Sequence, residues 1–440
     1  MNDRAGGQYA PEWFGSGAAA GSDPPATAAS ITRHLAREAL QNLAAGVPPP
    51  EEVEEFISVG LEHDLEILDH EYFGPDALLP NSTQGTFKLI EAYYGGGKTH
   101  YLRSVVRLAT KRGFASAFIE LNQSSCPLDR LDLVYIEVAR KLSVVLPNKR
   151  FVRGGLGEVI WEWATSPEIV EDEVDRRIEY AHEQVARVRT LPVQSLRKAL
   201  DAAAIAFASL DQSTWDDALV YLQGGKVSPA LRKRGVLEAI DAKNASRALS
   251  SIAIWLRSIG CPGLVLVMDE GDRSLSLQSS KNQRIAANNL VHLINEASAG
   301  QSWPGVMFLY SIPSWDAFNN AMGSDNPALT QRVKGTGFPD VPPAPRIVLD
   351  NRYTSVESKL QFCQNLGARL ALVFGMANPG TAAVAAESAG LAHLVAKAAV
   401  ERVQEVHFIR TFIKVFVSAL YVTSQGRRVS PADIDRILQE

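Results

Sequence analysis

Residues 86–99 read TFKLIEAYYGGGKT, and this stretch decides the fold class of the chain. The apolar run 86–92 follows turn-like residues and predicts a strand, while helical periodicity begins after Thr99. The glycines between strand and helix allow several backbone N–H groups to converge at a helix N-terminus, where anions bind well. This order of strand, Gly-rich loop and helix predicts a site for the phosphates of a nucleotide.

The phosphate site is predicted to bind ATP with Mg²⁺. Backbone N–H groups of the loop would hold the phosphates, the Lys98 ammonium would neutralise β/γ charge, and the Thr99 hydroxyl would bind the metal ion. The predicted contacts are Gly95, Gly96, Gly97, Lys98 and Thr99. Ala92 replaces the usual first glycine of this pattern and leaves its phosphate-facing part intact. The alternative, a flexible loop that happens to precede a lysine, does not explain the flanking strand and helix.

A second motif is the apolar run LVLVMDE at residues 264–270, which ends in two adjacent carboxylates. Open α/β sheets bind ligands at the carboxyl ends of their strands. We therefore predict that Asp269 holds Mg²⁺ and that Glu270 is the general base for water attack. A strand ending in Asp-Glu is by itself more often a polar turn, but its position after the Gly-rich loop favours a hydrolytic site.

Three further residues are candidates for the nucleotide site, and each of them also has an ordinary structural role as an alternative. Ser311 follows the strand expected at 306–310 and would orient the attacking water, or it simply caps the strand. Arg332 would reach the phosphate of a neighbouring subunit, or it is a solvated helix residue. Arg410 flanks the apolar stripe of residues 408–420 and would touch the nucleotide from that side, or it makes a surface ion pair.

Five short, nearly continuous apolar runs predict the sheet. Helical segments separate them, which is typical of parallel strands covered on both faces. The predicted strands are 86–92, 115–121, 264–268, 306–310 and 347–349. The fold class is therefore α/β, a P-loop NTPase with a parallel five-stranded sheet.

Helical patterns surround this predicted core. Residues 30–46 predict a helix with Ser30 as its N-cap and Gly46 as its end, and a second helix is expected from Pro50 to Ile67. The predicted division is a disordered tail at 1–29, N-terminal helices and the first part of the core at 30–132, a helical insertion without strands at 133–257, the second part of the core at 258–352, and a C-terminal helical lid at 353–440.

Composition narrows the class of protein further. The 440 residues are 46% hydrophobic and 21% charged with a net charge of −5, which is ordinary for a globular protein and provides no overall basic field. The three cysteines lie far apart, which disfavours disulfides and a thiolate zinc site. The N-terminus lacks the apolar segment of a signal peptide, and the longest apolar run is far too short to span a membrane, so we expect a cytoplasmic protein.

Any contact with DNA must therefore be local. Short basic clusters are the candidates, although solvated surface is the more frequent role of such clusters. They are Lys149, Arg150 and Arg153, then Arg232, Lys233 and Arg234, and finally Arg427 and Arg428.

The order of these motifs resembles AAA+ ATPases, especially their origin-recognition-like branch. The helix at 31–46, the strand 87–92 and the signature Tyr94-Gly95-Gly96-Gly97-Lys98-Thr99-His100 look more narrowly like the BrxD-type ATP-binding proteins of bacterial BREX phage-defence systems. The likeness covers most of residues 30–440, and Ala92 is its clear departure.

This resemblance implies a defence-associated ATPase that acts on foreign DNA with a helicase partner. It also implies that Tyr94 and His100 belong to the nucleotide site, and that subunits assemble into a homo-oligomer in which Arg332 acts in trans. A different class remains open: a STAND-like switch that holds ATP with little turnover and recruits a protein partner.

Overall fold

A mixed seven-stranded sheet forms the centre of the computed structural model, which describes residues 31–147, 151–165, 173–271, 279–299, 302–321, 330, 333, 343–402 and 408–439. Its strands are β1 (Thr86–Glu91), β2 (Ala115–Glu120), β3 (Leu142–Val145), β4 (Phe151–Val152), β5 (Leu264–Asp269), β6 (Val306–Ile312) and β7 (Arg346–Val348). They lie in the order β4-β3-β2-β5-β6-β1-β7.

All five predicted strands are present, and each is parallel to its neighbours among them. The prediction of a purely parallel five-stranded sheet is wrong, however, because β3 and β4 add an antiparallel edge beside β2. Both lie in the segment 133–257, where we expected helices alone. β3 has only four residues and directly follows helix α6 (Leu131–Lys141), so its apolar run is indistinguishable in sequence from the end of that helix.

Helices cover both faces of the sheet, as the apolar strands predict. Along β5, Val265 and Val267 belong to one core, while Leu266 and Met268 belong to the other. The first face is covered by α3 (Glu62–Leu68), the π-helix η2 (Asp69–Phe73), α4 (Leu78–Asn81) and α5 (Lys98–Lys111); the second is covered mainly by α6, α7 (Gly155–Ala164), α12 (Ala245–Ser258) and α13 (Ser280–Ala299).

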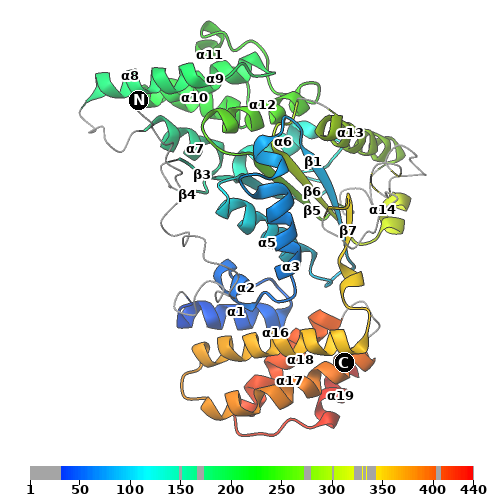
Figure 1. Cartoon of the computed structure of the whole chain (residues 1–440). Coiled ribbons are helices and arrows are strands. Elements are labelled where there is room, and N and C mark those ends of the chain that lie inside the picture. Colours follow the sequence, from blue (N-terminus) through cyan, green and yellow to red (C-terminus); the bar gives the residue numbers. More distant parts are fainter. Residues whose placement is uncertain are drawn as a thin grey trace, which may run out of the picture.

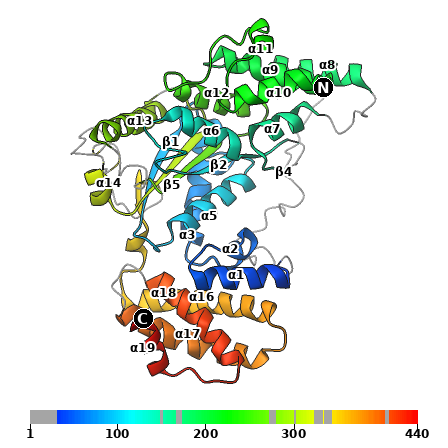
Figure 2. The same ribbon diagram turned by 180° about the vertical axis from the view of Figure 1, so that it is seen from behind.

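The helical insertion continues outward from the second face of the sheet. It contains α8 (Val174–Arg187), α9 (Gln194–Ala208), α10 (Gln212–Leu222) and α11 (Pro229–Lys233), and it shares one continuous hydrophobic core with α6, α7 and α12. Both views place it at the end of the molecule remote from the C-terminal helices (Figures 1 and 2). Helix α14 (Trp315–Ala321) follows β6 at the side of the sheet.

The C-terminal helices form a separate bundle with its own core. They are α16 (Val356–Ala377), α17 (Ala382–Arg402), α18 (Phe408–Ser424) and α19 (Pro431–Gln439). Helix α1 (Arg33–Ala45) packs against α16 and α18 rather than against the sheet (Figure 1), so the N-terminal helices are shared between the two bodies.

The boundaries of the N-terminal helices differ from those predicted. Thr32 caps α1 with its side chain, Gly46 ends it with a φ of +75°, and Ser30 lies outside the described residues. The helix expected at 50–67 is split into α2 (Glu51–Ile57), α3 and η2. The first piece ends where Ser58 adopts an extended conformation, and Gly60 then takes a φ of +77° in the turn that leads to α3.

Two connections join the bundle to the α/β core. One is the N-terminal segment from α1 to α3, and the other is the connecting segment, residues 346–353, which contains β7 and the 3₁₀ helix η3 (Leu349–Arg352). The connecting segment runs from the sheet edge beside β1 down to α16 (Figure 1). Both connections therefore pass the end of the sheet at which the Gly-rich loop lies.

Candidate nucleotide-binding site

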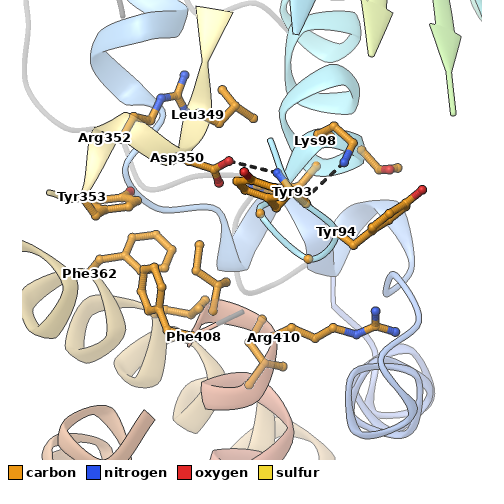
Figure 3. Close-up of a pocket in the computed structure, with 18 of the residues that line it drawn as sticks. Tyr93, Tyr94, Lys98, Leu349, Asp350, Arg352, Tyr353, Phe362, Phe408 and Arg410 are labelled. Atoms are coloured by element: carbon orange, nitrogen blue, oxygen red, sulfur yellow. Dashed lines mark hydrogen bonds between the residues drawn. The ribbon is translucent and has the colours of Figure 1, made fainter. Parts of the chain in front are cut away.

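A cavity of about 750 Å³ lies between the Gly-rich loop and the helical bundle. The α/β core, the N-terminal segment, the connecting segment and α18 all contribute to its walls (Figure 3). The predicted residues that line it are Tyr94, Gly95, Gly96, Gly97, Lys98, Thr99, His100, Glu270 and Arg410. Residues predicted from distant parts of the sequence therefore face one space.

The glycines of the loop have two different physical roles. Gly95 and Gly97 have φ values of +84° and +87°, which a side chain would strain. Gly96 is instead needed for close approach, because a Cβ atom there would lie 2.9 Å from the Ala92 Cβ and 2.8 Å from Asp350 Oδ1. The methyl group of Ala92, the departure from the usual pattern, is accommodated because residue 96 has no side chain.

Lys98 and Thr99 begin helix α5 and point to different partners. The Lys98 ammonium donates to the carbonyl oxygens of Ala92 at 2.6 Å and Tyr93 at 3.3 Å, and it lies 5.1 Å from the centre of the Tyr94 ring (Figure 3). The Thr99 hydroxyl donates to Asp269 Oδ2 at 2.8 Å. This hydrogen bond joins the two predicted motifs across 170 residues of sequence.

Asp269, Glu270 and Ser311 form one hydrogen-bonded group. β5 and β6 are paired so that Met268 lies opposite Tyr310, which places Asp269 beside Ser311. The buried Ser311 hydroxyl donates to Asp269 Oδ1. The Glu270 N–H in turn donates to Asp269 Oδ1 at 2.9 Å and to Ser311 Oγ at 3.1 Å. Ser311 thus contacts both carboxylate residues, although of the three only Glu270 lines the cavity.

Glu270 has a positive φ of +57°, although it is not a glycine. Such a conformation costs of the order of 1–3 kcal/mol and is concentrated at functional sites. In this conformation the Glu270 N–H faces Asp269 and Ser311. Glu270 itself lines the cavity.

His100 lines the cavity, but its ring contacts the N-terminal segment. Its Nδ1 lies 2.9 Å from Glu54 Oε1 and its Nε2 lies 3.0 Å from Ser58 Oγ. Burial alone would raise the pKa of Glu54, yet hydrogen bonds and charges from His100 and Arg103 outweigh it and hold that pKa below its usual value. The contact therefore links α5, directly after the Gly-rich loop, to α2.

Asp350 is a site residue that our sequence analysis missed. It lies in η3, lines the cavity, and its Oδ2 accepts a hydrogen bond from the Tyr93 N–H at 3.0 Å (Figure 3). The sequence nevertheless indicates Asp350, because this residue directly follows the strand predicted at 347–349. Asp269 was chosen for the same reason, as a carboxylate at the end of a parallel strand.

The donor set fits Mg²⁺. Thr99 and Asp269 offer a hydroxyl and a carboxylate oxygen 2.8 Å apart, and oxygen atoms are the ligands this ion prefers. Mg²⁺ in nucleotide sites typically uses one or two protein ligands together with phosphates and water. Among the described residues, no group of three or more His, Cys, Asp or Glu side chains is arranged to hold a metal.

Comparison with known proteins agrees with this geometry. The sequence matches the family of BREX system ATP-binding proteins BrxC/D over residues 31–437. The chain belongs to this family. It is therefore an ATP-binding protein of a BREX phage-defence system. Searches of curated proteins and of solved structures gave no match.

Of the remaining residues predicted for this BREX family member, Arg410 lies at the cavity and several others lie outside the described residues. Arg410 of α18 lines the cavity, and its side chain extends toward the N-terminal helices, where it donates to the Gly46 carbonyl at 3.1 Å (Figure 3). Arg332 lies outside the described residues, as do Lys149 and Arg150. In the portions of the chain that are described, none of the helices is long and apolar enough to cross a membrane.

The other basic clusters predicted for DNA are on the surface. Arg153 pairs with Glu51 at 2.6 Å, and Arg234 lies 3.7 Å from Asp211. Arg427 and Arg428 are exposed after α18. These pairs are of the exposed kind that contribute little to stability.

Proposed function

We propose that this BREX family member is a Mg²⁺-dependent ATPase whose site is the cavity between the Gly-rich loop and the helical bundle. The observation that carries the proposal is the hydrogen bond of 2.8 Å between Thr99 Oγ1 and Asp269 Oδ2. It brings the hydroxyl that begins α5 to the carboxylate that ends β5, at the carboxyl edge where α/β sheets bind ligands. Two motifs chosen independently from the sequence thus meet at one point.

Thr99 and Asp269 are the residues that would hold Mg²⁺, which would neutralise phosphate charge. Backbone N–H groups of the Gly-rich loop and the N-terminus of α5 would bind the phosphates. The Lys98 ammonium would exchange its contacts with the loop carbonyls for the phosphates. Arg410 and Tyr94 would contact the nucleotide from the bundle and from the loop.

Glu270 is our candidate for the general base, because it lines the cavity directly after Asp269. Its carboxylate would accept the proton of the attacking water. Ser311 would support this role by holding the Glu270 N–H and the Asp269 carboxylate together. His100 would set the position of α5 relative to α2.

The wider role is proposed from the family resemblance. We infer an AAA+-like ATPase of the cytoplasm that forms a homo-oligomer and acts on DNA with a helicase partner. Cys126, Cys261 and Cys363 are free and buried, which supports a reducing compartment.

If turnover is negligible and nucleotide is retained, the protein is instead a STAND-like switch that recruits a protein partner. The cavity walls from two bodies would suit such a switch, because nucleotide would hold the bodies together.

The decisive experiment is a fluorescent-ATP titration of wild type and Lys98→Ala. A charge-assisted phosphate contact contributes about 1.5–3 kcal/mol, so the variant should bind roughly 10- to 100-fold more weakly. Omitting Mg²⁺ should weaken binding by the wild type as well. Lys111→Ala, at the exposed end of the same helix, is the matched control and should bind as wild type does. Equal affinity of wild type and Lys98→Ala would reject the site.

A further inference from the structure

Asp350 places a negative charge against the loop that, in the proposed function, binds phosphates. Its Oδ2 accepts from the Tyr93 N–H at the start of the loop. Its Oδ1 lies where a Cβ on Gly96 would approach to 2.8 Å, so the carboxylate also packs against the middle of the loop. One side chain from the far end of the sequence therefore touches the loop at two places (Figure 3).

The segment that carries Asp350 is anchored to the α/β core on both sides of it. Before it, Arg346 Nε donates to Glu91 Oε2 at 2.6 Å, at the end of the strand that leads into the loop. After it, Arg352 forms an ion pair with Asp64 and lies 4.8 Å from the Tyr101 ring on α5. These contacts fix the backbone around Asp350 relative to the loop, so its carboxylate has little freedom to turn away.

The same segment contacts the helical bundle immediately afterwards. The Tyr353 ring lies 4.5 Å from that of Phe362 on α16 and 6.4 Å from that of Phe408 on α18. Only two residues, Asn351 and Arg352, therefore lie between a contact with the Gly-rich loop and a contact with the bundle. A change in the position of the bundle would therefore move Asp350, and a change in the position of Asp350 would move the bundle.

We propose that Asp350 is a positioning residue of the nucleotide site, which holds the start of the Gly-rich loop and links its conformation to the helical bundle. A Gly-rich loop has many accessible conformations, and its N–H groups bind phosphate well only when they converge. A fixed acceptor at Tyr93 removes part of that freedom before the nucleotide arrives, which is preorganisation. The inference rests on the proposed function, since it assumes that this loop binds the phosphates.

The two physical effects of the carboxylate have opposite signs. Its hydrogen bond favours the binding conformation, while its negative charge faces the same cavity as the phosphates and repels them. Asp350→Asn keeps an acceptor oxygen and removes the charge. Asp350→Ala removes both. The pair of variants therefore separates positioning from charge.

The experiment is a fluorescent-ATP titration of full-length Asp350→Ala and Asp350→Asn. Asp350→Ala should bind about tenfold more weakly, because the larger loss expected for one hydrogen bond with a charged acceptor is partly offset by removal of the repulsive charge. Asp350→Asn should bind as tightly as wild type or more tightly. Glu357→Ala, an exposed carboxylate at the start of α16, is the control and should bind normally. If Asp350→Ala does not fold, Asp350→Ser, which is too short to reach the Tyr93 N–H, takes its place.

The outcomes are distinct. Weak binding by Asp350→Ala, together with rescue by Asp350→Asn, supports the positioning role. Wild-type affinity in both variants, or equal weakness in both, overturns it. Lys98→Ala is titrated in parallel: if that variant also binds normally, the proposed site itself has failed, whereas loss in Lys98→Ala beside normal binding by Asp350→Ala rejects the role of Asp350 alone.

Discussion

Glu270 combines a strained backbone with the proposed role of general base. Its φ of +57° is a conformation that glycine adopts without a Cβ penalty. In this conformation the Glu270 N–H donates to Asp269 and Ser311. The strained backbone therefore lowers the stability of the fold but holds the geometry of the site.

Substitutions at Glu270 should separate activity from stability. Glu270→Gln keeps the shape but cannot accept a proton, so ATP should still bind while hydrolysis falls by about 10²- to 10⁴-fold. Glu270→Gly should lose hydrolysis similarly, yet its free energy of unfolding without nucleotide should rise by about 1 kcal/mol. Phosphate release and urea unfolding measure the two effects. A Glu270→Gly protein less stable than wild type would contradict the strain argument.

Lys88 is a charged residue buried in strand β1. Its ammonium donates to the Tyr72 hydroxyl and the Pro343 carbonyl at 2.8 Å each, and to the Ala344 carbonyl at 3.0 Å. All three acceptors are neutral, and burial lowers the pKa of Lys88 from 10.5 to about 7. The unfolded chain therefore binds a proton more tightly than the folded chain at this residue.

The sign of the pH effect follows from this shift. The cost of burying the charge is fully present below about pH 7 and disappears as pH rises toward 10.5, so Lys88 makes stability increase with pH in that window. Urea unfolding at pH 7 and pH 9 should show a smaller increase, or a larger decrease, for Lys88→Met than for wild type. Identical pH dependence in both proteins would show that Lys88 does not titrate there.

At the scale of the element, helix α16 contains two glycines with different surroundings. Gly367 lies at the crossing with α17 and α18, and a Cβ there would approach the Ala392 Cβ to 2.8 Å and the Phe412 ring to 3.3 Å. Gly375 lies on the same helix with nothing within 4 Å of such an atom. The first glycine permits close helix packing, and the second only weakens the helix.

Matched substitutions in α16 should therefore have opposite effects. Gly367→Val should lower the free energy of unfolding by about 1–3 kcal/mol through overpacking of the bundle core. Gly375→Ala should raise it by about 0.5–1 kcal/mol through better helix propensity. Urea unfolding followed by circular dichroism measures both changes. Equal effects of the two substitutions would contradict the packing assigned to α16.

For the whole molecule, the cavity lies between two bodies with separate cores. The α/β core supplies the Gly-rich loop and Glu270, while the bundle supplies Arg410. Arg332 precedes the last strand, where we expect it to complete the site of a neighbouring subunit. A site shared between subunits makes activity depend on assembly.

Mixing two inactive variants tests this assembly. Lys98→Ala keeps Arg332 but is expected to bind nucleotide roughly 10- to 100-fold more weakly. Arg332→Ala is expected to bind nucleotide but lacks the arginine, which can contribute about 10³- to 10⁵-fold in rate. The mixture should recover ATPase activity, and wild-type activity should rise more than linearly with concentration. Arg332→Ala mixed with the double variant Lys98→Ala/Arg332→Ala is the control without recovery. Full activity of Arg332→Ala at every concentration would exclude a trans role.

Local sequence was sufficient for features whose causes lie within a few residues. The strand at 86–91, the glycines that need positive φ, and the order of Lys98 and Thr99 at the start of α5 follow from side-chain chemistry at fixed spacing. The five parallel strands were also predictable, because burial on both faces requires continuous apolar runs. The meeting of Thr99 and Asp269 followed from the rule that parallel strands bind ligands at their carboxyl ends.

Only the tertiary structure showed which other segments surround the cavity. Asp350 reaches Tyr93 across 257 residues because β7 pairs with β1, and no local pattern specifies that pairing. Helix α1 has an amphipathic pattern that does not specify its partner, and in the structure its apolar face packs against α16 and α18. Residue type and spacing were thus enough to choose the candidate groups for the chemistry, because both are local properties of the sequence. The positions of Asp350, Glu54 and Arg410 around the cavity instead depend on packing between segments far apart in the chain.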